Sequence, residues 1–135
     1  MPVKLYAPDS YWKIPEKERN VRHTACGAGK GLGDFLIPDS LWGLNVTEAC
    51  RIHDYMYSVG KTEEDREMAD KAFLNNLVRL IEGRYKEGKW KPVEAVLATL
   101  RRYRAMSYYN AVRNFGGPAF WDSKNSEAEM EYVSL

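Results

Sequence analysis

The sequence predicts one domain that is mainly α-helical. Three long stretches have apolar residues recurring at spacings of three and four, and residues that favour helix starts and ends bound them. No stretch alternates strictly between apolar and polar residues, the pattern typical of a half-buried strand. With 135 residues, of which 44% are hydrophobic, the chain is long enough to bury a single core.

The first 46 residues are expected to form mostly loops and turns. They include three prolines before position 16 and, from position 23 onward, five of the ten glycines. The first long helix is predicted over residues 47–59, with Asn45 or Thr47 as its cap and Gly60 as its end.

Two more helices are predicted after this turn. Residues 62–65 nearly match a capping box, with aspartate in place of the usual glutamate or glutamine, and open a helix that is expected to end at Gly83. Residues 84–91 are expected to link it to a third helix, which begins near Pro92 and ends at residues 114–118.

The third helix carries an apolar face and several basic side chains. The apolar residues are expected to pack into the core, and they are Val93, Val96, Leu97, Leu100 and Tyr103. Arginines and nearby tyrosines are expected to form a solvated face, which would also suit an anionic lipid interface. This second face comprises Arg101, Arg102, Arg104, Tyr103, Tyr108 and Tyr109.

Charge is distributed unevenly, although the formal net charge is only +1. Residues 78–114 contain nine lysines and arginines against three glutamates, whereas residues 121–135 contain four acidic residues against one lysine. Residues 121–135 are therefore predicted to form a mobile acidic tail after a single domain of residues 1–120. A nucleic-acid partner is not expected, because the basic helix lacks an arginine-rich recognition pattern at base-reading spacing.

The sequence contains neither a membrane-spanning pattern nor a secretion signal. It has no run of about 18 apolar residues. Its first 20 residues lack the apolar middle region of a signal peptide. The protein is therefore expected to be made in the cytoplasm and either kept there or released by a route that the sequence does not show.

A cluster of reactive side chains lies on the first predicted helix. Cys50, His53, Asp54 and Tyr57 occupy positions i, i+3, i+4 and i+7, which places them on one helix face. On the second helix, Asp70 stands in an otherwise apolar stripe, where a carboxylate needs a charged or hydrogen-bonding partner. If the two helices pack antiparallel across their short turn, His53 is the natural partner. A histidine oriented by a buried carboxylate is suited to act as a general base.

A glycine-rich segment precedes this helix. Residues 26–33, with the sequence CGAGKGLG, let the backbone approach an ion or an oxyanion closely. A hard cation such as Ca²⁺ takes backbone carbonyls plus a carboxylate, which Asp54 can supply beside His53. Such a cation would polarise a substrate carbonyl while His53 takes a proton from water.

Together, these residues resemble the signatures of the phospholipase A2 superfamily. Cys26–Gly29 matches the C-G-x-G start of that family's calcium loop, and Cys50–Tyr57 matches its helix motif C-x-x-H-D-x-x-Y. Asp70 is placed where the family carries an aspartate on the following antiparallel helix. The resemblance covers residues 26–77 and implies a phospholipase A2-like fold, in which two antiparallel helices carry the site and a further C-terminal helix follows. It also implies calcium-dependent hydrolysis of a phospholipid acyl ester at a membrane surface.

The resemblance implies a role for each matched side chain. His53 would be the general base that activates the attacking water, Asp70 would orient it, and Tyr57 would hydrogen-bond Asp70. Cys26 and Cys50 match a disulfide of the family. Because the chain can form at most one disulfide, it is closer to the cysteine-poor viral and bacterial members, which suggests a phage or bacterial product.

The same resemblance implies a calcium site and an oxyanion hole. Asp54 would bind calcium together with the backbone carbonyls of Ala25, Gly27 and Gly29. The Gly27 amide and the ion would then stabilise the oxyanion. Lys30 stands where secreted members usually have a second adjacent glycine. This departure leaves open a protein that keeps the fold but has a weakened calcium loop and weakened catalysis.

A zinc-binding module is the alternative that the residues themselves leave open. His23, Cys26, Cys50 and His53 supply two histidines and two cysteines, a set that suits a tetrahedral structural zinc. The protein would then be a binding or scaffold module rather than an enzyme. This interpretation gives no role to the other polar residues of the cluster.

Overall fold

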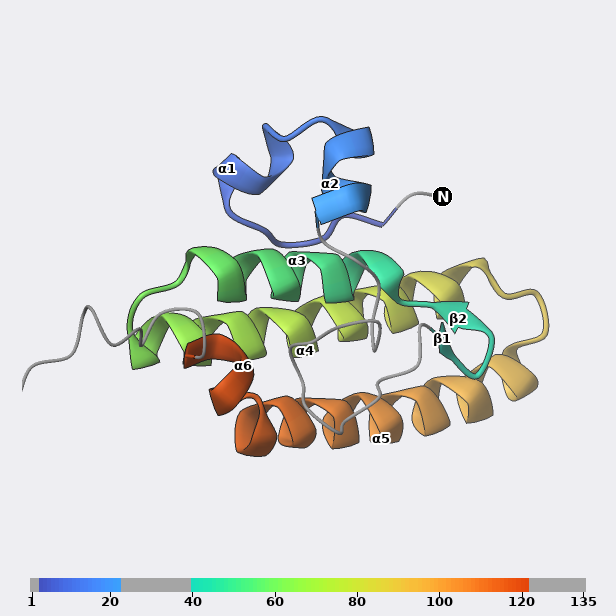
Figure 1. Cartoon of the computed structure of the whole chain (residues 1–135). Helices are drawn as coiled ribbons and strands as arrows, with labels where there is room; N and C mark the ends of the chain where they lie inside the picture. Colours follow the sequence, from blue (N-terminus) through green and yellow to red (C-terminus); the bar gives the residue numbers. More distant parts are fainter. Residues whose placement is uncertain (1–2, 23–39, 122–135) are drawn as a thin grey trace, which may run out of the picture.

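Three long helices form the body of the computed structural model, which describes residues 3–22 and 40–121 (Figure 1). α3 (Thr47–Val59), α4 (Glu63–Glu87) and α5 (Lys91–Phe115) lie side by side, with α4 between the other two. Because short turns join them in sequence, neighbouring helices run antiparallel. The expected mainly α class is confirmed, and so is the antiparallel packing of the first two long helices.

Short elements lie around this body. They are α1 (Asp9–Trp12), α2 (Glu16–Arg22), β1 (Ser40–Leu41), β2 (Leu44–Asn45) and α6 (Gly117–Trp121). α1 and α2 lie on the side of α3 that faces away from α4, and α6 follows the end of α5 (Figure 1). The sequence did not indicate α6, because its glycines and proline suggested only the end of a helix.

The two short strands form a hairpin that the sequence did not predict. β1 and β2 pair antiparallel, with Leu41 opposite Leu44. The two connecting residues, Trp42 and Gly43, both have positive φ angles, 46° and 82°. Positive φ at both central residues is what a type I′ hairpin turn requires. A strand of two residues is too short to show the alternation on which strand prediction depends.

α3 and α4 begin where the sequence predicts, but the cap of α3 differs. The N-cap residue of α3 is Val46, which makes no side-chain capping bond, and not the predicted Asn45 or Thr47. The Asn45 side chain accepts a hydrogen bond from the Thr47 amide at 2.8 Å, and Gly60 follows the last residue of α3. Thr62 and Asp65 form a reciprocal capping box at the start of α4, with bonds of 3.1 Å and 3.2 Å. Aspartate therefore serves here in the position where glutamate or glutamine is usual.

α4 extends beyond its predicted end. Gly83 lies inside the helix, which continues to Glu87, so only residues 88–90 link α4 to α5. A Cβ atom at position 83 would collide with the side chain of Val3. The glycine therefore makes room for the N-terminal segment and does not end the helix.

The apolar face predicted on α5 is not its buried face. Four of its five residues are exposed by 39% to 77%, namely Val93, Val96, Leu100 and Tyr103. The residues of α5 that reach the interior are mostly small, and they are Ala98, Arg101, Ala105, Ala111 and Val112. Small side chains on this stripe let α5 pack against α4. The larger apolar residues are left on the outside, and their predicted place in the core is wrong.

Arg101 is buried, although it was predicted to lie on a solvated face. Its side chain donates from Nε to the Leu41 carbonyl at 3.0 Å and from a terminal nitrogen to the Trp42 carbonyl at 2.7 Å. Burial lowers the pKa of the Arg101 guanidinium. Arg101 therefore ties the hairpin to α5, whereas Arg102 and Arg104 are exposed as expected.

α4 contributes to two apolar clusters. The larger cluster lies mainly toward α5 and the hairpin, and includes Leu41, Leu44, Val46, Ala49, Cys50, Phe73, Leu77, Ile81, Ala98, Ala105 and Val112. The other joins α3 to α1 and α6, and includes Tyr11, Ile52, Tyr55, Met56, Tyr57, Ala69, Ala72 and Phe120. Because α4 is packed on both sides, the polar groups on its packed faces, Asp70 and Asn76, are removed from water.

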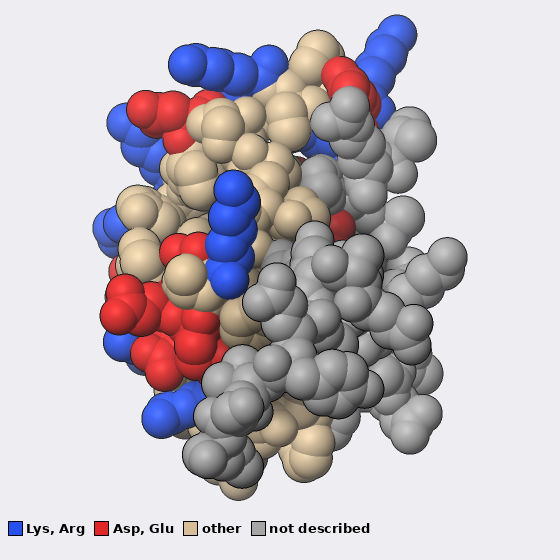
Figure 2. Space-filling model, turned by 60° about the vertical axis from the view of Figure 1, so that its left-hand side comes forward, with Lys and Arg blue, Asp and Glu red and all other residues tan. Residues whose placement is uncertain are grey.

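Charged side chains are unevenly distributed over the described surface. Figure 2 shows the largest acidic group on one side of the view and lysine and arginine side chains mostly elsewhere. No helix among residues 3–22 and 40–121 is long and apolar enough to cross a membrane. Trp121 belongs to α6, and the rest of the predicted acidic tail lies outside the described residues.

Candidate active site

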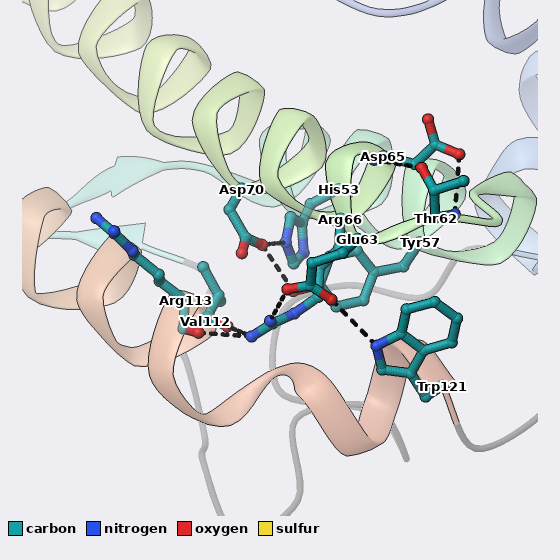
Figure 3. A network of polar contacts seen from close by, with 10 residues as sticks. All are labelled: His53, Tyr57, Thr62, Glu63, Asp65, Arg66, Asp70, Val112, Arg113 and Trp121. Atoms are coloured by element: carbon teal, nitrogen blue, oxygen red, sulfur yellow. Dashed lines mark hydrogen bonds and ion pairs between the residues drawn. The ribbon is translucent and has the colours of Figure 1, made fainter. Parts of the chain in front are cut away.

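His53 and Asp70 meet between α3 and α4 (Figure 3). His53 Nε2 lies 2.8 Å from Asp70 Oδ1, and the two residues are only 5% and 2% exposed. The Tyr57 hydroxyl donates to the same oxygen of Asp70 at 2.6 Å. The contacts expected from helical spacing and from the short turn after α3 are therefore present.

Local sequence and packing fix the orientation of these groups. His53 and Tyr57 are four residues apart, so both lie on the face of α3 that meets α4, and their ring centroids are 4.2 Å apart. Phe73, one turn after Asp70 on α4, lies 4.9 Å from the His53 ring. The His53 ring is thus packed against two other rings, and the two hydrogen bonds hold the Asp70 carboxylate.

The protons in this cluster have defined positions. Burial raises the pKa of the Tyr57 hydroxyl, and its hydrogen bond to Asp70 raises it further, so Tyr57 remains a donor at neutral pH. A carboxylate oxygen accepts hydrogen bonds, so the ring nitrogen of His53 that faces it carries a proton. In the neutral imidazole, Nδ1 then keeps its lone pair.

Asp54 and Cys50 occupy different surroundings along α3. The Asp54 side chain is exposed, whereas Cys50 is buried at 8% exposure within the larger apolar cluster. The predicted disulfide partner of Cys50 lies outside the described residues. The disulfide therefore stays a prediction.

The rest of the predicted site lies outside the described residues. It comprises His23, Ala25, Cys26, Gly27, Gly29 and Lys30. Within residues 3–22 and 40–121, no group of three or more histidine, cysteine, aspartate or glutamate side chains is gathered to hold a metal. The calcium loop, the oxyanion amide and half of the alternative zinc set therefore remain predictions.

Two residues that were not predicted to act on Tyr57 lie close to it. Phe120 of α6 packs edge-on against the Tyr57 ring, with centroids 5.3 Å apart. The charge of Arg66 on α4 lowers the pKa of Tyr57, against the larger effect of burial. Helical spacing contained a signal for Arg66, because it precedes Asp70 by four residues and so lies on the same face of α4. No comparable signal identified Phe120.

Comparison with known proteins adds no relative: no protein-family model matches the sequence, and no match was found among curated proteins or solved structures. A functional assignment therefore depends on the residues and their geometry.

Proposed function

We propose that the protein is a calcium-dependent hydrolase of phospholipid acyl esters, with a phospholipase A2-like fold and a His53–Asp70 dyad. The observation that carries the proposal is the buried arrangement in which His53 and Tyr57 both bond one oxygen of Asp70. Burial of a carboxylate beside an imidazole adds little to stability, and such groups gather at sites that move protons. The motif resemblance supplies the substrate class.

His53 is placed to act as the general base. Because Nε2 donates to Asp70, Nδ1 is the nitrogen that takes a proton from water. The oxygen of that water attacks the ester carbonyl carbon. The protonated ring then returns a proton to the leaving alkoxide, and the products are a fatty acid and a lysophospholipid. Asp70 stabilises the charged ring between these steps, and Tyr57 holds the carboxylate in place.

The residues present suit a calcium ion as far as they are described. Asp54 follows His53 directly and is exposed, and a carboxylate oxygen is a ligand that calcium prefers. The carbonyls of Ala25, Gly27 and Gly29 would complete the site. A bound ion would supply polarisation of the substrate carbonyl.

Calcium dependence tests the proposal. Fatty-acid release from phospholipid vesicles is expected to require calcium and to stop when a chelator is added. Asp54→Asn is expected to raise the calcium concentration for half-maximal rate at least about tenfold, because it removes the charged ligand. Release that is unchanged by the chelator would contradict the mechanism.

Elemental analysis separates this proposal from the alternatives. Protein purified without chelator is expected to contain no stoichiometric zinc, since the proposed mechanism needs the second ring nitrogen of His53 to take a proton and not to bind a metal. One zinc per chain would replace the enzyme by a structural module. Calcium binding without any fatty-acid release would instead indicate a catalytically weakened member of the family.

The proposed partner is an anionic phospholipid surface, met through the outer face of α5. We define this outer face by its exposed apolar residues, Trp90, Val93, Val96, Leu100 and Tyr103. Exposed cations flank it, namely Lys89, Lys91, Arg102 and Arg104. Arg104 also lies over the Trp42 ring, 5.0 Å from its centroid. Apolar and aromatic groups bordered by cations suit the headgroup region of an anionic membrane.

Acidic substitutions on the outer face are expected to weaken membrane binding. The double variant Val96→Glu/Leu100→Glu should lower partitioning onto anionic vesicles at least about tenfold, because it removes apolar contact and adds repulsion. Vesicle sedimentation measures the effect. Met68→Glu is the control, because Met68 is an exposed apolar residue of α4. Equal binding by the double variant and the control would contradict this surface.

A further inference from the structure

Arg66 lies one turn before Asp70 on α4 and bonds the C-terminal end of α5 (Figure 3). Its guanidinium donates to the Arg113 carbonyl at 2.5 Å and more weakly to the Val112 carbonyl at 3.5 Å. Another of its nitrogens donates to Glu63 at 2.6 Å. The Val112 carbonyl also accepts from the Gly116 amide at 2.9 Å. The Arg113 carbonyl lies in the last turn of α5, where a cation opposes the negative end of the helix dipole.

The same guanidinium also acts on Tyr57. Its interaction with the hydroxyl lowers the pKa of Tyr57, in opposition to the larger effects of burial and of Asp70. In the reverse direction, burial lowers the pKa of Arg66, but Glu63 and Tyr57 together raise it above its ordinary value. Arg66 therefore remains charged near Tyr57.

These donors and acceptors give the hydrogen bonds a single direction. The Tyr57 hydroxyl has one proton, and it donates this proton to Asp70 Oδ1. Asp70 Oδ1 accepts this proton and the one on His53 Nε2. A group that holds the Tyr57 hydroxyl in place therefore also holds the carboxylate that orients the base.

The junction between α5 and α6 encloses the Tyr57 hydroxyl from another side. A Cβ atom at Gly116 would lie 2.5 Å from the Tyr57 hydroxyl and would also collide with the Val112 carbonyl. Only glycine fits at this position without movement of one of these groups. The end of α5 thus supports both Arg66, through its carbonyls, and Tyr57, through close contact.

We propose that Arg66 is a positioning residue for the dyad, which acts through Tyr57 and couples the orientation of Asp70 and His53 to the end of α5. The part of the proposal that concerns the His53–Asp70 hydrogen bond depends only on the geometry. The part that concerns turnover rests on the proposed function. An experiment that reports on both therefore distinguishes failure of one from failure of the other.

Two readouts on the full-length protein test the proposal. The first is the downfield proton NMR signal of the His53 ring N–H that is bonded to Asp70, assigned by its loss in His53→Gln. Arg66→Met is expected to shift or broaden this signal, and to lower kcat about tenfold while KM changes less than about twofold. Arg66→Lys, which keeps a charged donor, should restore part of both.

A matched control and a double-mutant cycle decide the outcome. Arg79→Met is the control, because Arg79 also projects from α4 but bonds Asn75 and the Lys4 carbonyl. It should leave the signal and kcat unchanged. In a Tyr57→Phe background, Arg66→Met should have no further effect, since its route to Asp70 is already absent.

Two results would overturn the proposal. One is an unchanged His53 N–H signal in folded Arg66→Met. The other is an equal effect of Arg66→Met on this signal in the parent and in the Tyr57→Phe background. Circular dichroism establishes folding, and Arg66→Lys takes the place of Arg66→Met in the cycle if the latter does not fold. If neither the parent nor any variant releases fatty acid, the proposed function fails. The His53 N–H signal then tests the positioning role of Arg66 by itself.

Discussion

Replacement of His53 by glutamine is expected to reduce calcium-dependent phospholipid hydrolysis at least about a thousandfold. Glutamine is close to histidine in size and its side-chain amide can still donate to Asp70, so the buried carboxylate keeps a partner. It offers no nitrogen that takes a proton at neutral pH. The expected loss is therefore a loss of chemistry and not of fold. The initial rate of fatty-acid release at saturating calcium measures it.

A control on the same helix separates this effect from general disturbance of α3. Arg51 is partly exposed and bonds Glu48 at 3.5 Å, so Arg51→Gln should leave the rate within about twofold of the parent, as for a surface ion pair. The thermal unfolding midpoint of His53→Gln should remain close to that of the parent. A rate above about one tenth of the parent rate would exclude His53 as the base.

The contact between His53 and Asp70 was predictable because it depends on local features. The capping box at Thr62 sets the start of α4, and Gly60 ends α3, so the two helices must return along one another. Helical spacing then places His53 and Asp70 on facing sides. A carboxylate in an apolar stripe also signals a partner by itself, because an unpaired buried charge is unfavourable.

The wrong prediction for α5 has a different physical cause. Periodicity shows that a helix has an apolar face, but not which neighbour covers it or whether any neighbour does. α5 packs against α4 through Ala98 and Ala105, which are small enough for close approach. Arg101 is buried on this side because the hairpin presents two carbonyls to it. These carbonyls lie 60 and 59 positions before Arg101, so the local sequence could not indicate them.

Contacts between distant segments account for most of what sequence reasoning missed. Arg66 meets carbonyls that are 46 and 47 positions further along the chain. Gly83 looked like a helix end, yet it is a contact point for Val3. In each case the residue type suggested a local role, and a long-range contact determined its actual one. Such residues could be assigned only after the arrangement of the helices was known.

Replacement of Asp70 by asparagine is the second change with a very large expected effect on turnover. Both donors meet the same oxygen of Asp70, so the amide oxygen of asparagine can accept both hydrogen bonds with little rearrangement. The neutral amide does not stabilise the positive charge that forms on the His53 ring. We expect kcat to fall about 100-fold to 10,000-fold with little change in KM, as for loss of a group that acts in the transition state.

Asparagine keeps the shape of aspartate but not its charge. Asp70→Asn therefore distinguishes an orienting role of Asp70 from a catalytic role of its charge. If Asp70 served only to hold the His53 ring, asparagine would keep the ring in place and most of the activity would remain. If its charge stabilises the protonated ring, activity falls although the fold is intact. Steady-state kinetics together with thermal unfolding distinguish the two outcomes. Full activity in folded Asp70→Asn would contradict the dyad itself, because the carboxylate charge would then have no part in turnover.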